Sequence, residues 1–311
     1  MSNLPLVSIL VPIYGVERYI ERCAISLFNQ SYPNCEFVFV NDCTPDQSML
    51  ILRRTIDKFY WLKNRISIIE HETNKGIGAT RNSLLEAGKG HYILFVDSDD
   101  YVETNYVESL VSTGRGRDAD LVIMKQNGSK NVICTVDVER YKKKILLRKT
   151  PPCVWGKLFV RNIIVKGNLQ FVQGIDHCED FMFVSQYVTF VKSIFVINDC
   201  LYHYTIDNVD SYTSNFTEKS VKSIIRSLKQ VRTFYLKQNA NNKNILDLSA
   251  LEYYRGFLEK KVEKKIILKK YYIDFLNDLS LTGLSRIALV CLEKLPLIFS
   301  KLLFKILYYC V

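Results

Sequence analysis

The sequence contains no Cys-x-x-Cys pair, no repeat, no low-complexity tract and no apolar run of the roughly 18 residues that a membrane-spanning helix requires. Its nine cysteines stand singly and are odd in number, so neither a disulfide framework nor a zinc site is expected. Unpaired cysteines are typical of a reducing compartment, and residues 1–5 are too short and too polar for a signal peptide. We therefore expect a cytoplasmic protein.

Neither of two common phosphate-binding motifs is present. The segment from Asn74 to Asn82 has a Gly-x-Gly spacing, but it lacks the third glycine of the dinucleotide fingerprint and is not a Walker loop. It does open a predicted helix with glycines, and it carries Lys75 and Arg81, which suits contact with a nucleoside diphosphate. This segment alone leaves an alternative open: a surface loop whose arginine pairs with other groups of the protein and binds no phosphate.

The net charge of +10 is not spread evenly along the chain. Residues 1–220 contain 25 basic and 25 acidic side chains, whereas residues 221–311 contain 17 basic and 7 acidic ones. The positive excess therefore lies in the last third of the chain. It could bind a nucleic acid or an anionic membrane, or it could simply cover the solvent-exposed faces of helices. The tail has no recognised nucleic-acid-binding motif, so we expect no nucleic-acid partner.

The first 125 residues alternate between buried strands and amphipathic helices. Residues 7–14 form an apolar, β-branched run with little alternation, as expected for a strand that is buried on both faces. The pattern recurs at 36–42, after a helix at 17–30. Further strands are expected at 66–70, 92–96 and 120–124, and further helices at 46–60, 77–88 and 103–112, with a polar break at 113–118. This alternation predicts an α/β fold with a doubly wound, mainly parallel sheet and a ligand at the carboxyl ends of the strands.

Regularity weakens after residue 125 and returns as a helical pattern from Glu218 onward, interrupted by an Asn-rich break at 238–242. A chain of 311 residues can hold one large α/β domain with an appendage, or two small domains. We expect three parts: 1–125, 126–215 and a basic helical extension at 216–311.

Three carboxylates follow directly on a predicted buried strand, in the sequence Asp97-Ser98-Asp99-Asp100. Side chains alternate along an extended backbone, so Asp97 and Asp99 can converge on one hard cation while the other two face away. A cation held by one or two carboxylates and completed by substrate phosphates is the usual protein site for Mg²⁺ or Mn²⁺. An acidic turn that caps the next helix is the alternative.

Two adjacent strand ends present Pro12-Ile13-Tyr14 and Asp42. Together they could form a slot in which a base stacks on the tyrosine ring and hydrogen-bonds to the carboxylate. Asp42 also lies in a segment with turn chemistry, so an ordinary solvated turn residue is the other interpretation.

The order of these motifs resembles the family 2 glycosyltransferases of the GT-A fold, of the bacterial surface-polysaccharide type. The resemblance rests on Val-Pro-x-Tyr, Val-Asn-Asp, Asn-x-Gly-x-x-x-x-Arg-Asn and Asp-Ser-Asp-Asp; it is close over about residues 6–125 and looser to about 215. Two positions depart from the family pattern: Gly15 replaces the usual asparagine, and Cys43 replaces the usual glycine. The loop on the base side is therefore expected to differ in shape or donor preference.

The resemblance implies a nucleotide-sugar-binding half at 1–125 and an acceptor-binding half at 126–215. Asp99 with Asp97 would ligate Mn²⁺ or Mg²⁺, and His203 is a weaker candidate for the metal shell. The implied nucleotide-sugar contacts are Pro12, Tyr14, Glu17, Asp42, Asn74, Gly76, Arg81, Asp97 and Ser98.

In the second half, the family resemblance favours the pair Glu179-Asp180 as the candidate general base. An inverting transfer needs a carboxylate that takes the proton of the attacking acceptor hydroxyl. Asp180 is the first choice and Glu179 the second, with Asp176 as a rival and a helix-capping role as the alternative. The segment from Val154 to Phe159 resembles another recurring segment of the family, commonly near the acceptor side, so the resemblance implies Trp155 and Lys157 as candidate acceptor contacts. The aromatic face of Trp155 would complement a sugar's C–H surface, and buried packing of Trp155 is the other interpretation.

The basic tail at 260–311 interleaves lysines with apolar residues at helical spacing. We expect peripheral contact with an anionic cytoplasmic membrane surface, and packing on the catalytic domain or on a second copy in a homodimer is the alternative.

The sequence thus predicts a metal-dependent, inverting glycosyltransferase. It would move a sugar from a nucleoside diphosphate sugar, preferably a UDP-sugar, to a glycan or lipid-linked acceptor in surface polysaccharide synthesis. A sugar nucleotidyltransferase is one alternative, although Tyr14 to Glu17 offer no phosphate loop after the first strand. A non-catalytic glycan-binding or scaffold protein is the other.

Overall fold

The computed structural model describes residues 4–125, 132–206, 216–259, 265–279, 281 and 283–294. Contacts between residues divide the chain into two compact units. The sheet unit comprises Met1–Val138 and Cys153–Ser211, and the helical unit comprises Glu139–Pro152 and Tyr212–Val311.

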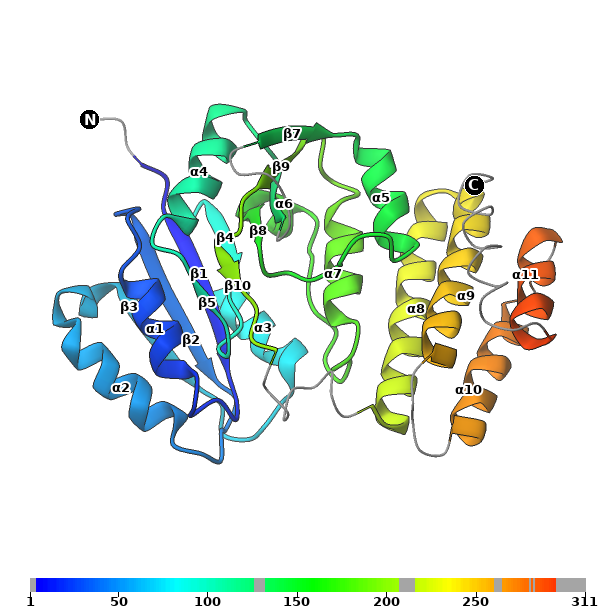
Figure 1. Cartoon of the computed structure of the whole chain (residues 1–311), viewed down its shortest axis with the longest axis horizontal. Coiled ribbons are helices and arrows are strands. Elements are labelled where there is room, and N and C mark those ends of the chain that lie inside the picture. The colour runs from blue at the N-terminus through cyan, green and yellow to red at the C-terminus, as the bar shows by residue number, and fades with distance from the viewer. Residues whose placement is uncertain are drawn as a thin grey trace. The chain divides into compact units, whose positions relative to one another are not determined.

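The first half of the sheet unit is the predicted run of alternating strands and helices (Figure 1). The strands lie in the order β3-β2-β1-β4, and all neighbours among them are parallel. Every residue of β1 is buried, which explains why its sequence shows no alternation. The elements are β1 (Val7–Ile13), α1 (Ile20–Phe28), β2 (Cys35–Asn41), α2 (Ser48–Lys58), η1 (Tyr60–Arg65), β3 (Ile66–Glu70), α3 (Ile77–Ala87) and β4 (Tyr92–Phe95).

The second half extends the same sheet to the order β3-β2-β1-β4-β8-β6-β9-β7. β8 is antiparallel to both of its neighbours, β6 and β9 are parallel, and β7 is antiparallel to β9. A separate antiparallel pair joins β5 to β10. The elements are β5 (Tyr101–Val102), α4 (Tyr106–Gly116), β6 (Leu121–Lys125), β7 (Val132–Val136), β8 (Lys157–Val160), α6 (Arg161–Lys166), α7 (Glu179–Tyr187), β9 (Ile194–Asn198) and β10 (Tyr202–His203). The α/β fold with a mainly parallel central sheet is therefore confirmed.

One predicted break is wrong. Residues 113–118 were expected to interrupt the helix, but α4 continues through Gly116. A Cβ at Gly114 would lie 3.0 Å from the Leu158 side chain, so this glycine permits a close approach of α4 to β8. Packing therefore outweighs the low helix propensity of glycine at this position.

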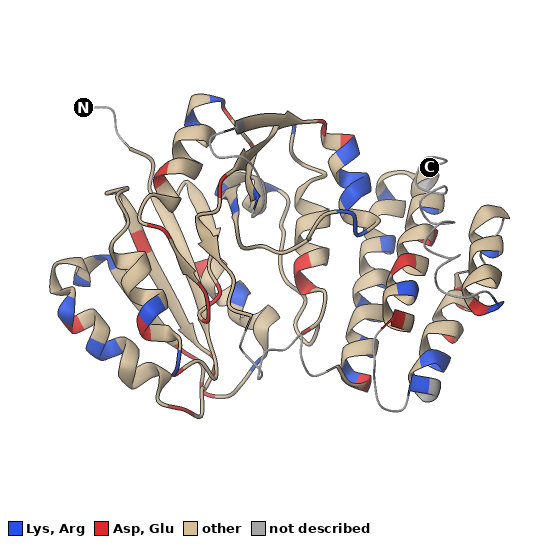
Figure 2. Cartoon of the chain, in the orientation of Figure 1, with Lys and Arg blue, Asp and Glu red and all other residues tan. Residues whose placement is uncertain are grey.

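The helical unit is built from α5 (Val138–Leu146), α8 (Glu218–Gln238), α9 (Lys243–Glu259), α10 (Lys265–Asp278) and α11 (Gly283–Lys294), with the short helix η2 (Ala240–Asn242) between α8 and α9. The expected Asn-rich break falls at η2. Figure 2 shows Lys and Arg positions, coloured blue, along α5, α8 and α10. None of the described helices is both long enough and apolar enough to cross a membrane.

Candidate functional site

The carboxyl ends of β1, β2 and β4 meet at one edge of the sheet, because the three strands are parallel neighbours. Pro12 is buried within β1, whereas the ring of Tyr14 is 49% exposed just beyond it. The backbone N–H of Asp42 donates to the carbonyl of Ile13 across this edge, at 3.0 Å. The structure thus brings Tyr14 and Asp42 to the same edge of the sheet, as the sequence predicted.

The loops after β1 and β2 are joined by side-chain hydrogen bonds. The backbone N–H of Glu17 donates to Asp46, and the Glu17 carboxylate accepts from the backbone of Gln47 at 3.0 Å. Gly15 donates to Thr44. Both positions that depart from the family pattern lie in this region and have positive φ, 67° at Gly15 and 56° at Cys43. Cys43 therefore adopts the left-handed conformation that glycine adopts more easily.

Asp42 is buried, and both of its carboxylate oxygens have partners within the protein. Oδ1 lies 2.7 Å from Nδ1 of His71 and accepts the backbone N–H of Lys75, while Oδ2 accepts the backbone N–H of Gly76. The other ring nitrogen of His71 lies 2.9 Å from Ser83 Oγ on α3. Asp42 and His71 therefore hold the loop that leads into α3.

That loop needs its glycines for close contact. Gly76 has a φ of 83°, and a Cβ there would lie 2.5 Å from the Asp176 carboxylate. A Cβ at Gly78 would already lie 3.0 Å from the carbonyl of Val172. Asn74, by contrast, is exposed beside them. The start of α3 is thus packed directly on the segment that precedes α7.

The acidic motif after β4 shows the predicted alternation. Asp97 and Asp99 are half-buried, whereas Ser98 and Asp100 are buried. Asp100 accepts hydrogen bonds from the Tyr202 hydroxyl at 2.6 Å and from the backbone N–H of Thr205 at 2.8 Å. Burial and the nearby Asp97 raise the pKa of Asp100 to about 7. The alternation leaves Asp97 and Asp99 as the more accessible pair.

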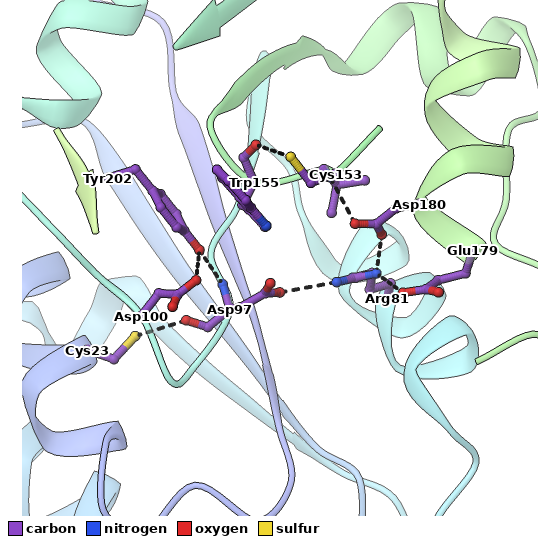
Figure 3. Close-up of polar contacts among 10 residues, drawn as sticks. Cys23, Arg81, Asp97, Asp100, Cys153, Trp155, Glu179, Asp180 and Tyr202 are labelled. Carbon is purple, nitrogen blue, oxygen red and sulfur yellow. Dashed lines mark hydrogen bonds and ion pairs between the residues drawn. The ribbon is translucent and has the colours of Figure 1, made fainter. Parts of the chain in front are cut away.

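Arg81 links the two halves of the site (Figure 3). Its side chain is on α3 and is 4% exposed. One guanidinium nitrogen donates to Glu179 at 2.7 Å and also to Asp180, and the other donates to Asp97 at 3.1 Å. Three carboxylates from two segments, the loop after β4 and the start of α7, therefore surround one buried cation.

Glu179 and Asp180 occupy the first turn of α7, just after Cys178 in the left-handed conformation. Burial, and then the charge of Asp180, raise the pKa of Glu179, although Arg81 opposes the shift. Burial also raises the pKa of Asp180 against the opposing charge of Arg81. These shifts move both carboxyl groups toward the pH range in which a general base operates.

The candidate acceptor residues lie beside Asp180. Its second carboxylate oxygen accepts the backbone N–H of Val154 at 3.0 Å, immediately before Trp155. The Trp155 ring is half-buried and stacks on Tyr202 with ring centroids 4.8 Å apart. Lys157 is 3% exposed, and its ammonium donates to the carbonyl of Cys153 at 2.6 Å.

His203 lies on β10, where its ring stacks on Tyr101 and its Nε2 is 2.7 Å from Glu103. Among the described residues, no group of three or more His, Cys, Asp and Glu side chains could enclose a metal ion.

Sequence reasoning missed His71 and Tyr202. His71 directly follows β3, just as Asp42 directly follows β2, and the two strands are parallel neighbours. The contact between His71 and Asp42 could therefore have been predicted from the order of strands in the sequence. Tyr202 is separated from Asp100 by 102 residues, and no local signal connects them.

Comparisons with known proteins show the family of the chain and its fold. The sequence matches the family described as Glycosyl transferase family 2 over residues 8–144. EpsH of Bacillus subtilis (strain 168), named as a glycosyltransferase, is 32% identical over 297 residues, which cover 91% of this chain and 80% of EpsH.

Two solved structures share the fold. Residues 1–349 of Staphylococcus aureus TarS in complex with UDP-GlcNAc align with a TM-score of 0.69 at 22% identity, covering 88% of this chain and 80% of that one. The mannosyltransferase PcManGT of Pyrobaculum calidifontis, in complex with GDP-Man and Mn²⁺, aligns with a TM-score of 0.55 at 13% identity, covering 97% and 87%. At these identities both likenesses bear on the fold alone.

Proposed function

The chain belongs to glycosyltransferase family 2, and we propose that it transfers a sugar from a nucleoside diphosphate sugar to an acceptor hydroxyl with inversion. A UDP-sugar is the favoured donor, and a glycan or lipid-linked acceptor in surface polysaccharide synthesis is the favoured substrate. Support comes from the relative TarS, which is named as a poly(ribitol-phosphate) beta-N-acetylglucosaminyltransferase, and from UDP-GlcNAc in a structure of that protein.

The observation that carries this proposal is the cluster around Arg81. It joins Asp97, at the end of the strand where the donor diphosphate is expected, to Glu179 and Asp180 on α7. A buried arginine held by carboxylates on both sides fixes their separation, because each contact is a charge-assisted hydrogen bond. Preorganised groups of this kind orient two reactants for one displacement.

The acidic pair fits a hard divalent cation. Asp97 and Asp99 are half-buried and are the proposed oxygen ligands, and no cluster among the described residues completes a coordination shell by itself. Mg²⁺ and Mn²⁺ characteristically take one or two carboxylates and complete the shell with substrate phosphates and water. When bound, such a cation would neutralise charge on the departing diphosphate.

On the acceptor side, Asp180 is the proposed general base and Glu179 the second choice. The raised pKa of Asp180 suits a carboxylate that takes a proton from the acceptor hydroxyl. Val154 and Arg81 hold its two oxygens in place. Trp155 and Lys157 remain the proposed acceptor contacts, and the Lys157 ammonium also donates to the carbonyl of Cys153, which precedes Trp155 in the same loop.

On the donor side, Tyr14 and Asp42 remain the proposed base contacts, together with Pro12. The exposed Tyr14 ring supplies the stacking face. Glu17, Asn74, Gly76, Arg81, Asp97 and Ser98 remain proposed contacts of the nucleotide sugar, and His203 remains a weaker proposed metal ligand. Asp42 and Gly76 are already joined by a hydrogen bond, so a donor would meet a preformed loop.

Peripheral membrane contact through residues 260–311 is also proposed. Residues 260–264 and 295–311 lie outside the described residues. Within α11, Leu284, Ile287 and Val290 are exposed, while Ala288, Leu289 and Leu292 are buried. An apolar face of this kind beside basic residues suits an anionic membrane surface; a homodimer contact is the alternative.

The donor assignment can be tested by thermal unfolding of the whole protein against a panel of nucleotide sugars, with and without Mn²⁺. Binding to the folded state raises the unfolding temperature, so one class of nucleotide sugar should stabilise the protein and should do so only with the metal. A sugar nucleotidyltransferase would respond instead to a nucleoside triphosphate with a sugar 1-phosphate. A glycan-binding or scaffold protein would respond to neither.

A further inference from the structure

Three aromatic rings form a continuous stack beside the candidate site. Trp155 stacks on Tyr202 at a centroid distance of 4.8 Å and an interplanar angle of 14°. Trp155 also stacks with Tyr204, at 5.9 Å and 25°. Tyr202 is 2% exposed, Trp155 is half-buried and Tyr204 is 42% exposed. The stack therefore leads from the protein interior to solvent.

The stack is tied to both halves of the reaction centre (Figure 3). The Tyr202 hydroxyl donates to Asp100 at 2.6 Å and accepts the backbone N–H of Asp97 at 3.2 Å. Trp155 directly follows Val154, whose backbone N–H binds Asp180. A molecule that lies against Tyr204 would thus rest on a stack whose inner ring contacts the acidic motif and whose middle ring follows the residue that binds the proposed base.

The backbone on either side of Tyr204 is held firmly. Tyr202 and His203 pair with β5, and the backbone N–H of Thr205 donates to Asp100. The Thr205 hydroxyl donates to the carbonyl of Asp99 at 2.6 Å and accepts from Arg22 at 2.8 Å. A ring that is already fixed loses little conformational entropy when a ligand binds, so less of the binding free energy is lost in ordering it.

We propose that Tyr204 is the outer part of the acceptor subsite and that its exposed face binds a pyranose ring of the acceptor. This inference rests on the proposed function and extends it. A pyranose has an apolar C–H face that fits an aromatic ring, and its hydroxyls can face solvent or polar groups at the same time. Neither a purely apolar chain nor an acyclic polyol offers both features in one rigid ring.

The test is saturation-transfer NMR on the full-length protein with methyl β-glucopyranoside and its 2-acetamido counterpart, with ribitol as the acyclic control. We expect enhancement of the pyranoside ring protons that falls at least fivefold in Tyr204→Ala and is retained in Tyr204→Phe. Tyr60→Ala is the matched control, because Tyr60 is an aromatic residue of the same unit and is 73% exposed on η1. It should leave the enhancement unchanged.

Three results would overturn the subsite: no pyranoside enhancement in the unmodified protein, equal enhancement in Tyr204→Ala, or ribitol enhancement equal to that of the pyranosides. The proposed function fails separately. If the pyranosides bind through Tyr204 but no nucleotide sugar is ever consumed, the subsite stands and the transferase mechanism does not.

Discussion

Arg81 is the residue on which the electrostatics of the site depend most. It is buried, and it faces Asp97, Glu179 and Asp180 at once. Removing one partner of a buried charge cluster leaves the other charges without compensation, which costs far more than losing a surface ion pair. Arg81 therefore contributes to stability as well as to the geometry of the site.

Substituting Arg81→Met should lower the free energy of unfolding at pH 7.5 by about 3–5 kcal/mol. The deficit should shrink at pH 5.5, because burial raises the pKa of both Glu179 and Asp180 and protonation then removes the uncompensated charge. Urea denaturation at the two pH values measures the effect.

The matched control is Arg53→Met. Arg53 pairs with Glu70 at 2.7 Å, but both side chains are about half exposed, so the loss should be only about 0–1 kcal/mol. Equal losses in the two variants would show that the Arg81 cluster is an ordinary surface network.

The pH profile of turnover tests the assignment of the base. A general base must be ionised, and burial raises the pKa of Asp180, so kcat/KM should fall on the acidic side at a pH above the ordinary aspartate pKa of about 3.9. Asp180→Asn should abolish transfer and keep donor binding. If Glu179→Gln abolishes transfer while Asp180→Asn retains it, Glu179 is the base.

Which site residues the sequence could predict depends on how local their signal is. Asp97 and Asp99 were recognisable because a buried strand ends directly before them, and the alternation of their burial was expected. The partners of Arg81 were not, because Glu179 and Asp180 lie 98 and 99 residues away along the chain. Only the folded sheet brings α3 and α7 together at this point.

Among the structural elements, β10 and the residues after it position the acidic motif. Tyr202 donates to Asp100 and accepts from the backbone of Asp97, so it holds the loop that carries the proposed metal ligands. Tyr202→Phe should keep the aromatic stack but lose both hydrogen bonds. We expect the Mn²⁺ concentration for half-maximal turnover to rise about fivefold to 150-fold, because each of the two lost hydrogen bonds contributes about 0.5–1.5 kcal/mol.

Tyr187→Phe is the control for this prediction. Its hydroxyl is equally buried and also makes two hydrogen bonds, to the carbonyl of Asp120 and from the backbone N–H of Val160. It should lower stability without changing the Mn²⁺ requirement. An equal change in both variants would mean that Tyr202 acts through general stability alone.

The exposed apolar face of α11 allows a second prediction at the scale of the structural elements. Replacing Leu284, Ile287 and Val290 with serine removes exposed apolar surface while leaving the buried face of the helix intact. Binding to vesicles that contain anionic phosphatidylglycerol should weaken at least tenfold, a change of about 1.4 kcal/mol. Sedimentation with vesicles measures it.

Val165→Ser is the control for the α11 face, because Val165 is similarly exposed, at 58%, on α6 of the sheet unit. It should leave vesicle binding unchanged. If the α11 substitutions change the oligomeric state rather than vesicle binding, the face belongs to a homodimer contact.

The strands and helices of the first 125 residues were predictable because each buried strand is a continuous apolar run and each helix has one apolar face. The antiparallel insertion of β8 between β4 and β6 was not, since it depends on long-range pairing. The same holds for residues 139–152, which belong to the helical unit although α8 begins only at Glu218.

At the scale of the whole molecule, charge and chemistry are partitioned. The candidate site lies entirely within the sheet unit, whereas the basic excess of the sequence lies after residue 220. This partition is consistent with one unit that carries out the transfer and another that contacts a membrane or a partner. Vesicle binding and turnover should therefore respond to different substitutions.

The most direct test of the central claim is the release of nucleoside diphosphate from a panel of nucleotide sugars, measured with and without Mn²⁺ for the unmodified protein and for Asp99→Asn. We predict release from one class of donor that requires the metal, and loss of that release in a variant with an unchanged unfolding temperature. Full activity of Asp99→Asn, or release that is equally fast after removal of divalent cations with EDTA, would contradict the account.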